Sequence, residues 1–186
     1  MKENSLGNSG FTLLELLLAL AISSIIIVSL YSVLNFTVKT CKLGDEEDEI
    51  LLNGRYAIEY IKREIKSAEK IIDINMIPDL KKEYENNIGF IIMRYINDGN
   101  YKYNYSTYYL KNDKIYRIAA NMNTENYPNS NAFEGHNQIA EYVISLEGTK
   151  IDSESKLIDL TFTLKGEYTK ETRFNTKLYI RCPIVY

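Results

Sequence analysis

The sequence predicts an α+β protein, in which a long N-terminal helix packs on a C-terminal antiparallel β-sheet domain. Three observations predict it: an uncharged apolar run near the N-terminus, an amphipathic helical pattern directly after it, and β-branched or aromatic segments separated by turn residues. The helix is expected to have a transmembrane half and an amphipathic half. The predicted divisions are a polar leader at 1–10, a membrane-spanning helix at 11–38, an amphipathic helix at 39–73 and a β-rich globular domain at 74–186.

The apolar run extends from Leu16 to Val38 without a formal charge. Its length of about 23 residues, at about 1.5 Å rise each, is enough to cross a hydrocarbon core of about 30 Å. A secretory signal peptide has its small-residue cleavage site after the apolar stretch. Here the small residues Ser9 and Gly10 come before it, so that a cut at this point leaves the helix on the mature protein.

Glu15 is an ionisable residue at the edge of the apolar run, where a charge is costly and suggests a function. One interpretation places its carboxylate in water at the membrane interface. In the other, a cut before Phe11 creates an amino group one helical turn away, and the same amine of an adjacent molecule pairs with the carboxylate during lateral assembly.

The string from Gly10 to Glu15, followed by the long apolar run, resembles the processing and methylation motif of type IV prepilins and type II secretion pseudopilins. The resemblance implies that Gly10 precedes the bond cut by prepilin peptidase and that Phe11 becomes the N-methylated first residue. It also implies that Glu15 matches the terminus of a neighbouring subunit during assembly.

The same resemblance implies a single-pass protein of the cytoplasmic membrane with its N-terminus inside, which later enters an extracellular filament or pseudopilus. The distribution of positive charge supports this orientation only weakly. Lys2 precedes the span, whereas Lys39 and Lys42 follow it.

After the span, the acidic run Asp45–Glu49 has two interpretations: a solvated helix surface or bend, or a negative collar that faces a basic surface of a partner subunit. An amphipathic helix is predicted next, ending near Ile72, with bends or loosening expected at Gly44 and Gly54. Its apolar face recurs at steps of three and four residues, at Leu51, Gly54, Ile58, Ile61, Ile65, Ala68 and Ile72.

The rest of the chain has the pattern of strands. Asp98-Gly99 is a hairpin signal between Ile88–Ile96 and an alternating tyrosine run at 101–109. Those tyrosines form either a platform for a sugar or partner, or a half-buried sheet face. A second turn is expected at 111–113, before 115–118, and later strands at 142–146, 157–164 and 172–180, with Gly148 and Gly166 among the breaks.

Residues 121–138 lack periodicity and predict a surface loop or a contact segment for a neighbouring subunit, with the single histidine, His136, exposed near its end. Cys41 and Cys182 are too few for a metal motif; two separate thiols are the favoured interpretation, and a disulfide between them is the alternative.

Composition and motifs argue against other classes of function. The net charge of −3 lacks the basic excess of a protein that binds nucleic acid by bulk charge. None of the common catalytic, phosphate-binding or metal-binding motifs occurs, so no enzyme activity, catalytic residue, metal or cofactor is expected.

Two further segments, 53–68 and 107–117, look like the helix and the strand–turn–strand of J/W-type minor pilins. This resemblance implies a low-abundance subunit of the tip complex that primes filament assembly. Its partners would be other minor and major pilins, prepilin peptidase, the inner-membrane assembly platform and, before assembly, membrane lipid. The alternatives are a filament-displayed adhesin, a DNA- or glycan-binding pilin, and a pseudopilin of a type II secretion or competence DNA-uptake system.

Overall fold

The computed structural model describes residues 11–96 and 98–186. Its chain divides into two compact units, one ending at Gly44 and the other comprising Asp45–Tyr186. A single helix, α1 (Leu13–Lys66), begins in the first unit and ends in the second. None of the helical residues of the first unit is buried. This helix is long and apolar enough to cross a bilayer.

The second part of α1 is the spine of the globular domain. Its buried face consists of Ile50, Gly54, Ala57, Ile61, Glu64 and Ile65. α1 continues without interruption through Gly44 and Gly54, the two positions where bends or loosening were expected. At Gly54 an added Cβ would overlap the ring of Phe174, so this glycine permits a close approach of strand and helix.

The helix ends at Lys66, before the predicted end near Ile72. Residues Lys70–Asp73 form strand β1 instead. In a strand, consecutive side chains point to opposite faces, and here Ile71 enters one hydrophobic core while Ile72 enters the other. The three- and four-residue spacing of the apolar residues predicts helix for Ile72, but Ile72 lies in a strand that is buried on both faces.

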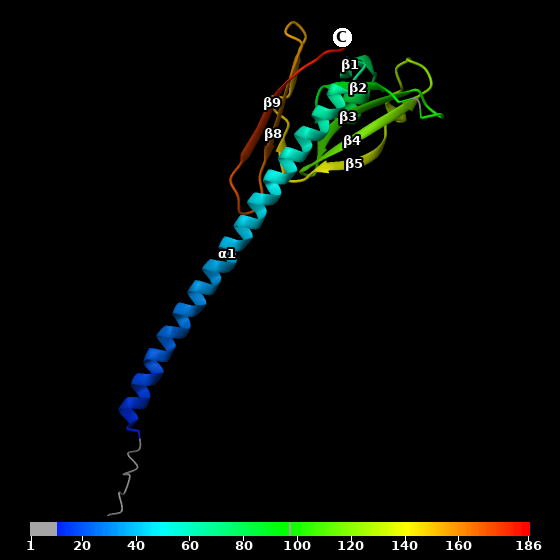
Figure 1. Ribbon diagram of the computed structural model, residues 1–186. Coiled ribbons are helices and arrows are strands. Elements are labelled where there is room, and N and C mark those ends of the chain that lie inside the picture. Colours follow the sequence, from blue (N-terminus) through cyan, green and yellow to red (C-terminus); the bar gives the residue numbers. More distant parts are fainter. Residues whose placement is uncertain (1–10, 97) are drawn as a thin grey trace, which may run out of the picture. The chain divides into compact units, whose positions relative to one another are not determined.

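The larger sheet has six strands in the order β10-β1-β2-β3-β4-β5 (Figure 1). Strand β10 runs parallel to β1, and all other neighbours in this sheet are antiparallel. The strands other than β1 are β2 (Phe90–Tyr95), β3 (Tyr103–Lys111), β4 (Lys114–Met122), β5 (Glu134–Ala140) and β10 (Ile184–Val185).

The smaller sheet is antiparallel and is built around β8 (Leu157–Leu164). Strand β6 (Val143–Ser145) pairs with the C-terminal end of β8, and β7 (Lys150–Asp152) pairs with its N-terminal end. Strand β9 (Thr172–Tyr179) pairs with β8 along its whole length. This arrangement confirms the predicted α+β class.

Two hydrophobic cores lie on opposite faces of the larger sheet. The first joins the buried face of α1 to both sheets, through side chains such as Phe90, Tyr108 and Phe162. The second is covered by the connection between β1 and β2, which contains η1 (Ile74–Met76) and α2 (Leu80–Glu83). A further short helix, η2 (Ser130–Ala132), precedes Phe133 of this second core.

The two predicted hairpins are confirmed. Strands β2 and β3 are antiparallel neighbours across the Asp98-Gly99 turn, where Gly99 has φ 90°. Asn112 and Asp113, with φ of 50° and 57°, form the tight turn between β3 and β4. The predicted strands at 157–164 and 172–180 correspond to β8 and β9.

The expectation of a loop throughout 121–138 is wrong. Strand β4 runs to Met122, and β5 begins at Glu134 and pairs with β4 with irregular register. The first five of the seven residues of β5 are exposed, and only its last two, Ile139 and Ala140, are buried. A strand at the edge of a sheet buries little side-chain surface, so it leaves almost no hydrophobic alternation in the sequence.

Candidate functional site

The start of α1 is fixed by a reciprocal capping arrangement between Thr12 and Glu15. The backbone N–H of Thr12 donates to Glu15 Oε2 at 2.9 Å, and the Thr12 hydroxyl donates to the same oxygen at 3.0 Å. The Glu15 N–H lies 3.3 Å from Thr12 Oγ1, which accepts from it. The Thr12 carbonyl accepts from the Leu16 N–H, as the first bond of the helix. This is a capping box, in which each side chain satisfies a backbone group of the other.

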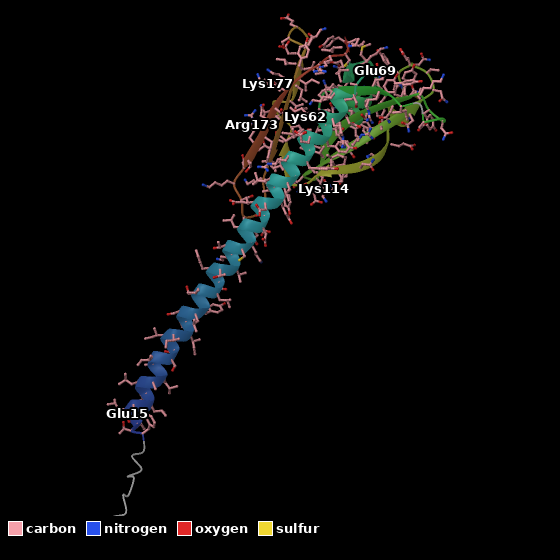
Figure 2. The ribbon with its side chains drawn as sticks, in the orientation of Figure 1. Glu15, Lys62, Glu69, Lys114, Arg173 and Lys177 are labelled. Carbon is pink, nitrogen blue, oxygen red and sulfur yellow. The ribbon has the colours of Figure 1, made fainter. Side chains whose placement is uncertain are left out.

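Phe11 directly precedes Thr12 at the start of α1, and Glu15 lies in the first turn, where Figure 2 labels it. The Phe11 side chain is 87% exposed and Leu13 is 78% exposed, so neither is covered by the chain. Gly10 and the leader at 1–10 lie outside the described residues. The capping box holds the Glu15 carboxylate on the backbone N–H of Thr12. Thr12 directly follows Phe11, and Phe11 is the residue expected to carry the new amine.

The acidic run after Gly44 divides between inward and outward side chains. Glu46 accepts from the backbone N–H groups of Glu167 and Tyr168, the latter at 2.7 Å, and Glu49 accepts from the Tyr142 hydroxyl at 2.7 Å. Asp45, Glu47 and Asp48 are exposed. Neither interpretation of the run describes all of it, because two of its acids attach the helix to loops of its own domain.

Residues 6–31 match the family model of the prokaryotic N-terminal methylation motif. This match spans the Gly10–Phe11 junction, the capping box and the first part of the apolar helix. It supports a precursor of the type IV pilin and pseudopilin kind, and with it a structural rather than an enzymatic protein. Neither a curated protein nor a solved structure is significantly similar to the chain.

The methylation motif and the apolar helix together fit membrane anchoring followed by display in a filament. They also imply processing by prepilin peptidase and assembly with other pilins. The α+β architecture, with its long N-terminal helix and C-terminal sheets, is consistent with a pilin-like fold.

Sequence reasoning missed a buried polar cluster on the face of α1. Glu64 is only 4% exposed although it carries a charge. Arg117 Nη2 lies 3.0 Å from Glu64 Oε1, and Arg94 Nη2 lies 2.8 Å from the same oxygen. The second oxygen, Oε2, accepts from the Ser106 hydroxyl at 3.0 Å and from the Tyr108 hydroxyl. The available signal was spacing, since Glu64 lies three residues after Ile61 on the buried face.

Charge balance explains why the cluster is tolerated. Burial alone raises the pKa of Glu64, but hydrogen bonding to Arg117 and the positive charges of Arg117 and Arg94 outweigh it, so the pKa lies below its ordinary value. Burial and the neighbouring carboxylate raise the pKa of Tyr108. The cluster ties α1 to β2, β3 and β4.

The tyrosine run does not form an exposed platform. Tyr105 is fully buried and donates to the Glu125 carbonyl at 2.9 Å, while Tyr109 is 7% exposed and packs against Tyr84. The half-buried sheet face is therefore the correct interpretation. His136 is exposed, as predicted, and its Nδ1 lies 2.9 Å from the Tyr109 hydroxyl.

The two cysteines are free thiols in different surroundings. Cys41 is exposed on α1, and Cys182 is half-buried after β9, where burial raises its pKa. A disulfide between them stays a prediction. Within residues 11–96 and 98–186, no three His, Cys, Asp or Glu side chains are grouped closely enough to hold a metal.

Proposed function

We propose that this chain is the precursor of a type IV pilin-like subunit, which prepilin peptidase cuts between Gly10 and Phe11. The observation that carries the proposal is the methylation-motif match, which covers both sides of that bond and continues into the apolar helix. Cleavage releases the polar leader and leaves α1 on the mature protein. The new N-terminus, Phe11, is then N-methylated.

In this proposal Glu15 has two successive roles. In the precursor it caps α1 through Thr12, with hydrogen bonds of 2.9 and 3.0 Å to the same oxygen. In the filament its carboxylate pairs with the Phe11 amine of a neighbouring subunit, since an unpaired charge among packed apolar helices is costly. The first part of α1, with none of its residues buried by the chain, supplies the surface on which neighbouring helices pack.

The subunit would wait in the cytoplasmic membrane with its N-terminus inside and its globular domain on the outer side. Assembly then extracts it into a filament, driven by the assembly platform, so that every covalent step belongs to a partner protein. Protease added to intact spheroplasts should digest the globular domain; complete protection of that domain in sealed cells would contradict this orientation.

We further place the chain among minor subunits of the J/W type, which act in the tip or initiation complex. The support is the resemblance of residues 53–68 and 107–117 to that group. Deletion of the gene should then reduce the number of filaments, with the major subunit still processed and present in the membrane. Filaments in normal number that merely lack this protein would contradict an initiating role.

Mass spectrometry of the mature N-terminus tests the central claim. In cells with prepilin peptidase the protein should begin at N-methylated Phe11, and in cells without it the leader should remain. Gly10→Val is the matched cleavage variant, because it changes the residue before the bond and leaves α1 intact. A chain that keeps its leader in the presence of the peptidase would overturn the proposal.

Two substitutions separate the roles of Glu15. Glu15→Gln keeps a side chain that can close the capping box but removes the charge, whereas Glu15→Ala removes both. If the carboxylate pairs with a neighbour's amine, both variants should be cut normally and lost from filaments. Normal incorporation of Glu15→Gln would show that only helix capping matters.

A further inference from the structure

Strand β9 has one edge that no other strand covers. It runs antiparallel to β8 along all eight of its residues, and it pairs with no further strand among the described residues (Figure 1). Beyond the last pair of this ladder, the Ile180 N–H donates to the Lys156 carbonyl at 2.8 Å. The backbone groups of Ile180 therefore point to β8, and this fixes which residues of β9 point the other way.

Alternation along the strand identifies the groups on the free edge. In an antiparallel ladder, residues that bond to the neighbouring strand alternate with residues whose N–H and C=O point away from it. Starting from Ile180, the even-numbered residues of β9 therefore bond to β8. Thr161, which lies opposite Asn175, fits this order, because its N–H donates to Thr149 Oγ1 at 3.0 Å and so points away from β9. The residues whose backbone groups point to the free edge, called the edge residues below, are Arg173, Asn175, Lys177 and Tyr179.

The groups on the free edge are available for hydrogen bonding. Among the described residues, no hydrogen bond is made by the N–H or C=O of the edge residues, and all four of their side chains are exposed. The ladder of β9 with β8 is also continuous, whereas the pairing of β5 with β4 contains register shifts. A long, regular and unpaired edge is a template for one more strand.

A basic groove runs along this edge. It has a volume of about 460 Å³ and lies between β9 and the C-terminal part of α1. Both the exposed Lys177 and the buried Leu178 line it, so the groove passes along the edge of β9 and not over one face only. The described residues that line it include no acidic side chain and four basic ones: Lys62, Lys66, Lys177 and Arg181. We refer to it as the β9 groove.

Two of these four cations are uncompensated in the part of the chain that the structure describes. Lys62 Nζ lies 2.7 Å and Lys177 Nζ 3.7 Å from a carboxylate oxygen, whereas Lys66 and Arg181 are exposed and form no ion pair. Positive charge on an edge strand opposes indiscriminate pairing. It also disfavours a second copy of β9 as the added strand, because like charges opposite each other are destabilising. The strand that fits this edge is acidic.

We propose that the free edge of β9 binds an extended acidic segment of a different protein, which adds one strand to the smaller sheet. The segment exchanges main-chain hydrogen bonds with the edge residues. Its carboxylates lie near Lys66 and Arg181, and its apolar side chains cover the wall of the β9 groove, which is formed by Ile65, Ala68 and Leu178. The main-chain bonds attach the segment, and the charges select it.

This surface is independent of the N-terminal motif. Each of its residues belongs to the compact unit Asp45–Tyr186, and strand addition requires neither cleavage before Phe11 nor a second copy of this chain. Only the source of the segment rests on the proposed function, which makes another subunit of the filament the expected partner. A subunit present in few copies can use such a surface, because the partner differs from itself.

Hydrogen exchange of the full-length chain in detergent tests the site. The probe is a synthetic peptide of eight residues, the length of β9, in which glutamate alternates with valine or threonine. Without the peptide, the amide hydrogens of the edge residues should exchange faster than those of the residues between them, which bond to β8. Saturating peptide should slow the exchange of the edge residues by about tenfold. Unchanged exchange at these residues would overturn the proposal.

Two N-methylated peptides separate strand addition from simple charge attraction. In one, N-methyl groups replace the N–H hydrogens of the glutamates, and in the other they replace those of the intervening residues. Only one of these alternating sets can point to β9, so one peptide should bind about tenfold more weakly than the other. Equal affinities would mean that charge alone holds the peptide, and the added strand would then be wrong.

Charge reversal tests the choice of an acidic partner. Lys66→Glu with Arg181→Glu should weaken binding of the acidic peptide by about tenfold. Lys111→Glu with Lys170→Glu is the matched control, because both lysines are exposed outside the groove and the net charge changes equally. A peptide with the sequence of β9 itself, Thr172–Tyr179, should not bind. Equal weakening by the two pairs of reversals, or tighter binding of the β9 peptide, would contradict an acidic partner.

A proline on the edge tests the backbone directly. Asn175→Pro removes one N–H from the free edge and spares the bonds to β8, since proline is tolerated where the N–H faces away from the neighbouring strand. Asn175→Ala is the control, because both variants lose the side-chain hydrogen bond to Thr161 and only the first loses the N–H. The proline variant alone should bind the acidic peptide about tenfold more weakly, with the same unfolding midpoint as the alanine variant. Equal binding by the two variants would count against strand addition.

The two proposals fail in different ways. If the acidic peptide does not bind and mature chains begin at Phe11, only the strand addition is wrong. If the leader remains in cells with prepilin peptidase and the peptide binds, the proposed function is wrong and the added strand stands.

Discussion

The two parts of α1 differ in what covers them. All six buried residues of the helix lie between Ile50 and Ile65, and none lies before Gly44. Yet the earlier part is the more apolar, with Leu, Ile and Val side chains that are mostly more than half exposed. One helix therefore carries two kinds of hydrophobic surface: one is buried within the domain, and the other is exposed.

That contrast separates folding from assembly. Residues on the later part obtain their stability from sheets of the same chain, so changes there should alter unfolding. The earlier part needs lipid or other helices, because so much exposed apolar surface is unfavourable in water. Substitutions there should alter insertion or incorporation and leave the globular domain intact.

The largest expected effect comes from removing the charge at the centre of the covered part. Glu64→Ala would leave Arg117 buried without its carboxylate partner, which should cost about 3–5 kcal/mol. Thermal unfolding of the full chain in detergent, followed by near-ultraviolet circular dichroism of the tyrosines, measures it. Glu15→Ala is the matched control on the open part and should leave the unfolding midpoint unchanged; equal losses would erase the contrast.

The same cluster predicts a pH dependence. Burial raises the pKa of Glu64, but the hydrogen bond and the positive charge of Arg117 outweigh this effect. The pKa is therefore lowered in the folded state, and the ionised form stabilises the fold. This contribution is complete above the unfolded pKa of about 4.3 and is lost as the pH falls through the folded value. Glu64→Gln should flatten this part of the stability profile. A profile below pH 4.5 that is unchanged by the substitution would argue against the cluster as its source.

Substitution of the helical glycines by alanine should have smaller effects on the free energy of unfolding, of opposite sign in the two parts of α1. An added Cβ at Gly54 would overlap the Phe174 ring, whereas at Gly44 it would meet nothing within 4 Å. Gly54→Ala should destabilise the domain by about 1–3 kcal/mol through overpacking. Gly44→Ala should stabilise the helix by up to about 1 kcal/mol. Phe174→Leu should relieve the first effect, and two glycines that respond alike would contradict the assignment.

Periodicity predicted most of the fold because it reports burial. Strands β8 and β9 alternate strongly, and the turns at Gly99 and at Asn112-Asp113 have residues suited to positive φ. Four strands left no such signal. Strand β1 has both neighbouring isoleucines buried, β5 is an exposed edge, and β7 and β10 have only three and two residues.

The candidate site was predictable where function acts through local sequence. Glu15 is unusual within its own segment, and the Thr-x-x-Glu spacing that closes its capping box is visible in the sequence. Glu64 is not unusual in this way, because its partners Arg94 and Arg117 come from strands far along the chain. Only the fold brings these three residues together. From the sequence alone, Glu64 therefore cannot be distinguished from an ordinary exposed residue of the helix.

The smallest effect tests the boundary between the two parts. Glu46 lies just after Gly44 and holds the β8–β9 loop by accepting from the N–H groups of Glu167 and Tyr168. Glu46→Ala should loosen this loop, and trypsin should then cut after Lys165 or Lys170 a few-fold faster, since local opening controls such cleavage. The midpoint of thermal unfolding should barely change.

Glu47→Ala is the matched control, because it removes an exposed neighbouring acid that has no partner in the described part of the chain. Faster cleavage in Glu46→Ala alone would mean that the helix is held by its own domain from its first turn after Gly44. Equal rates in both variants would move the start of the covered part to Glu49, whose bond to Tyr142 is the next contact along the helix. Glu49→Ala would then be the variant that opens the domain, which is why the three acids should be compared in one series.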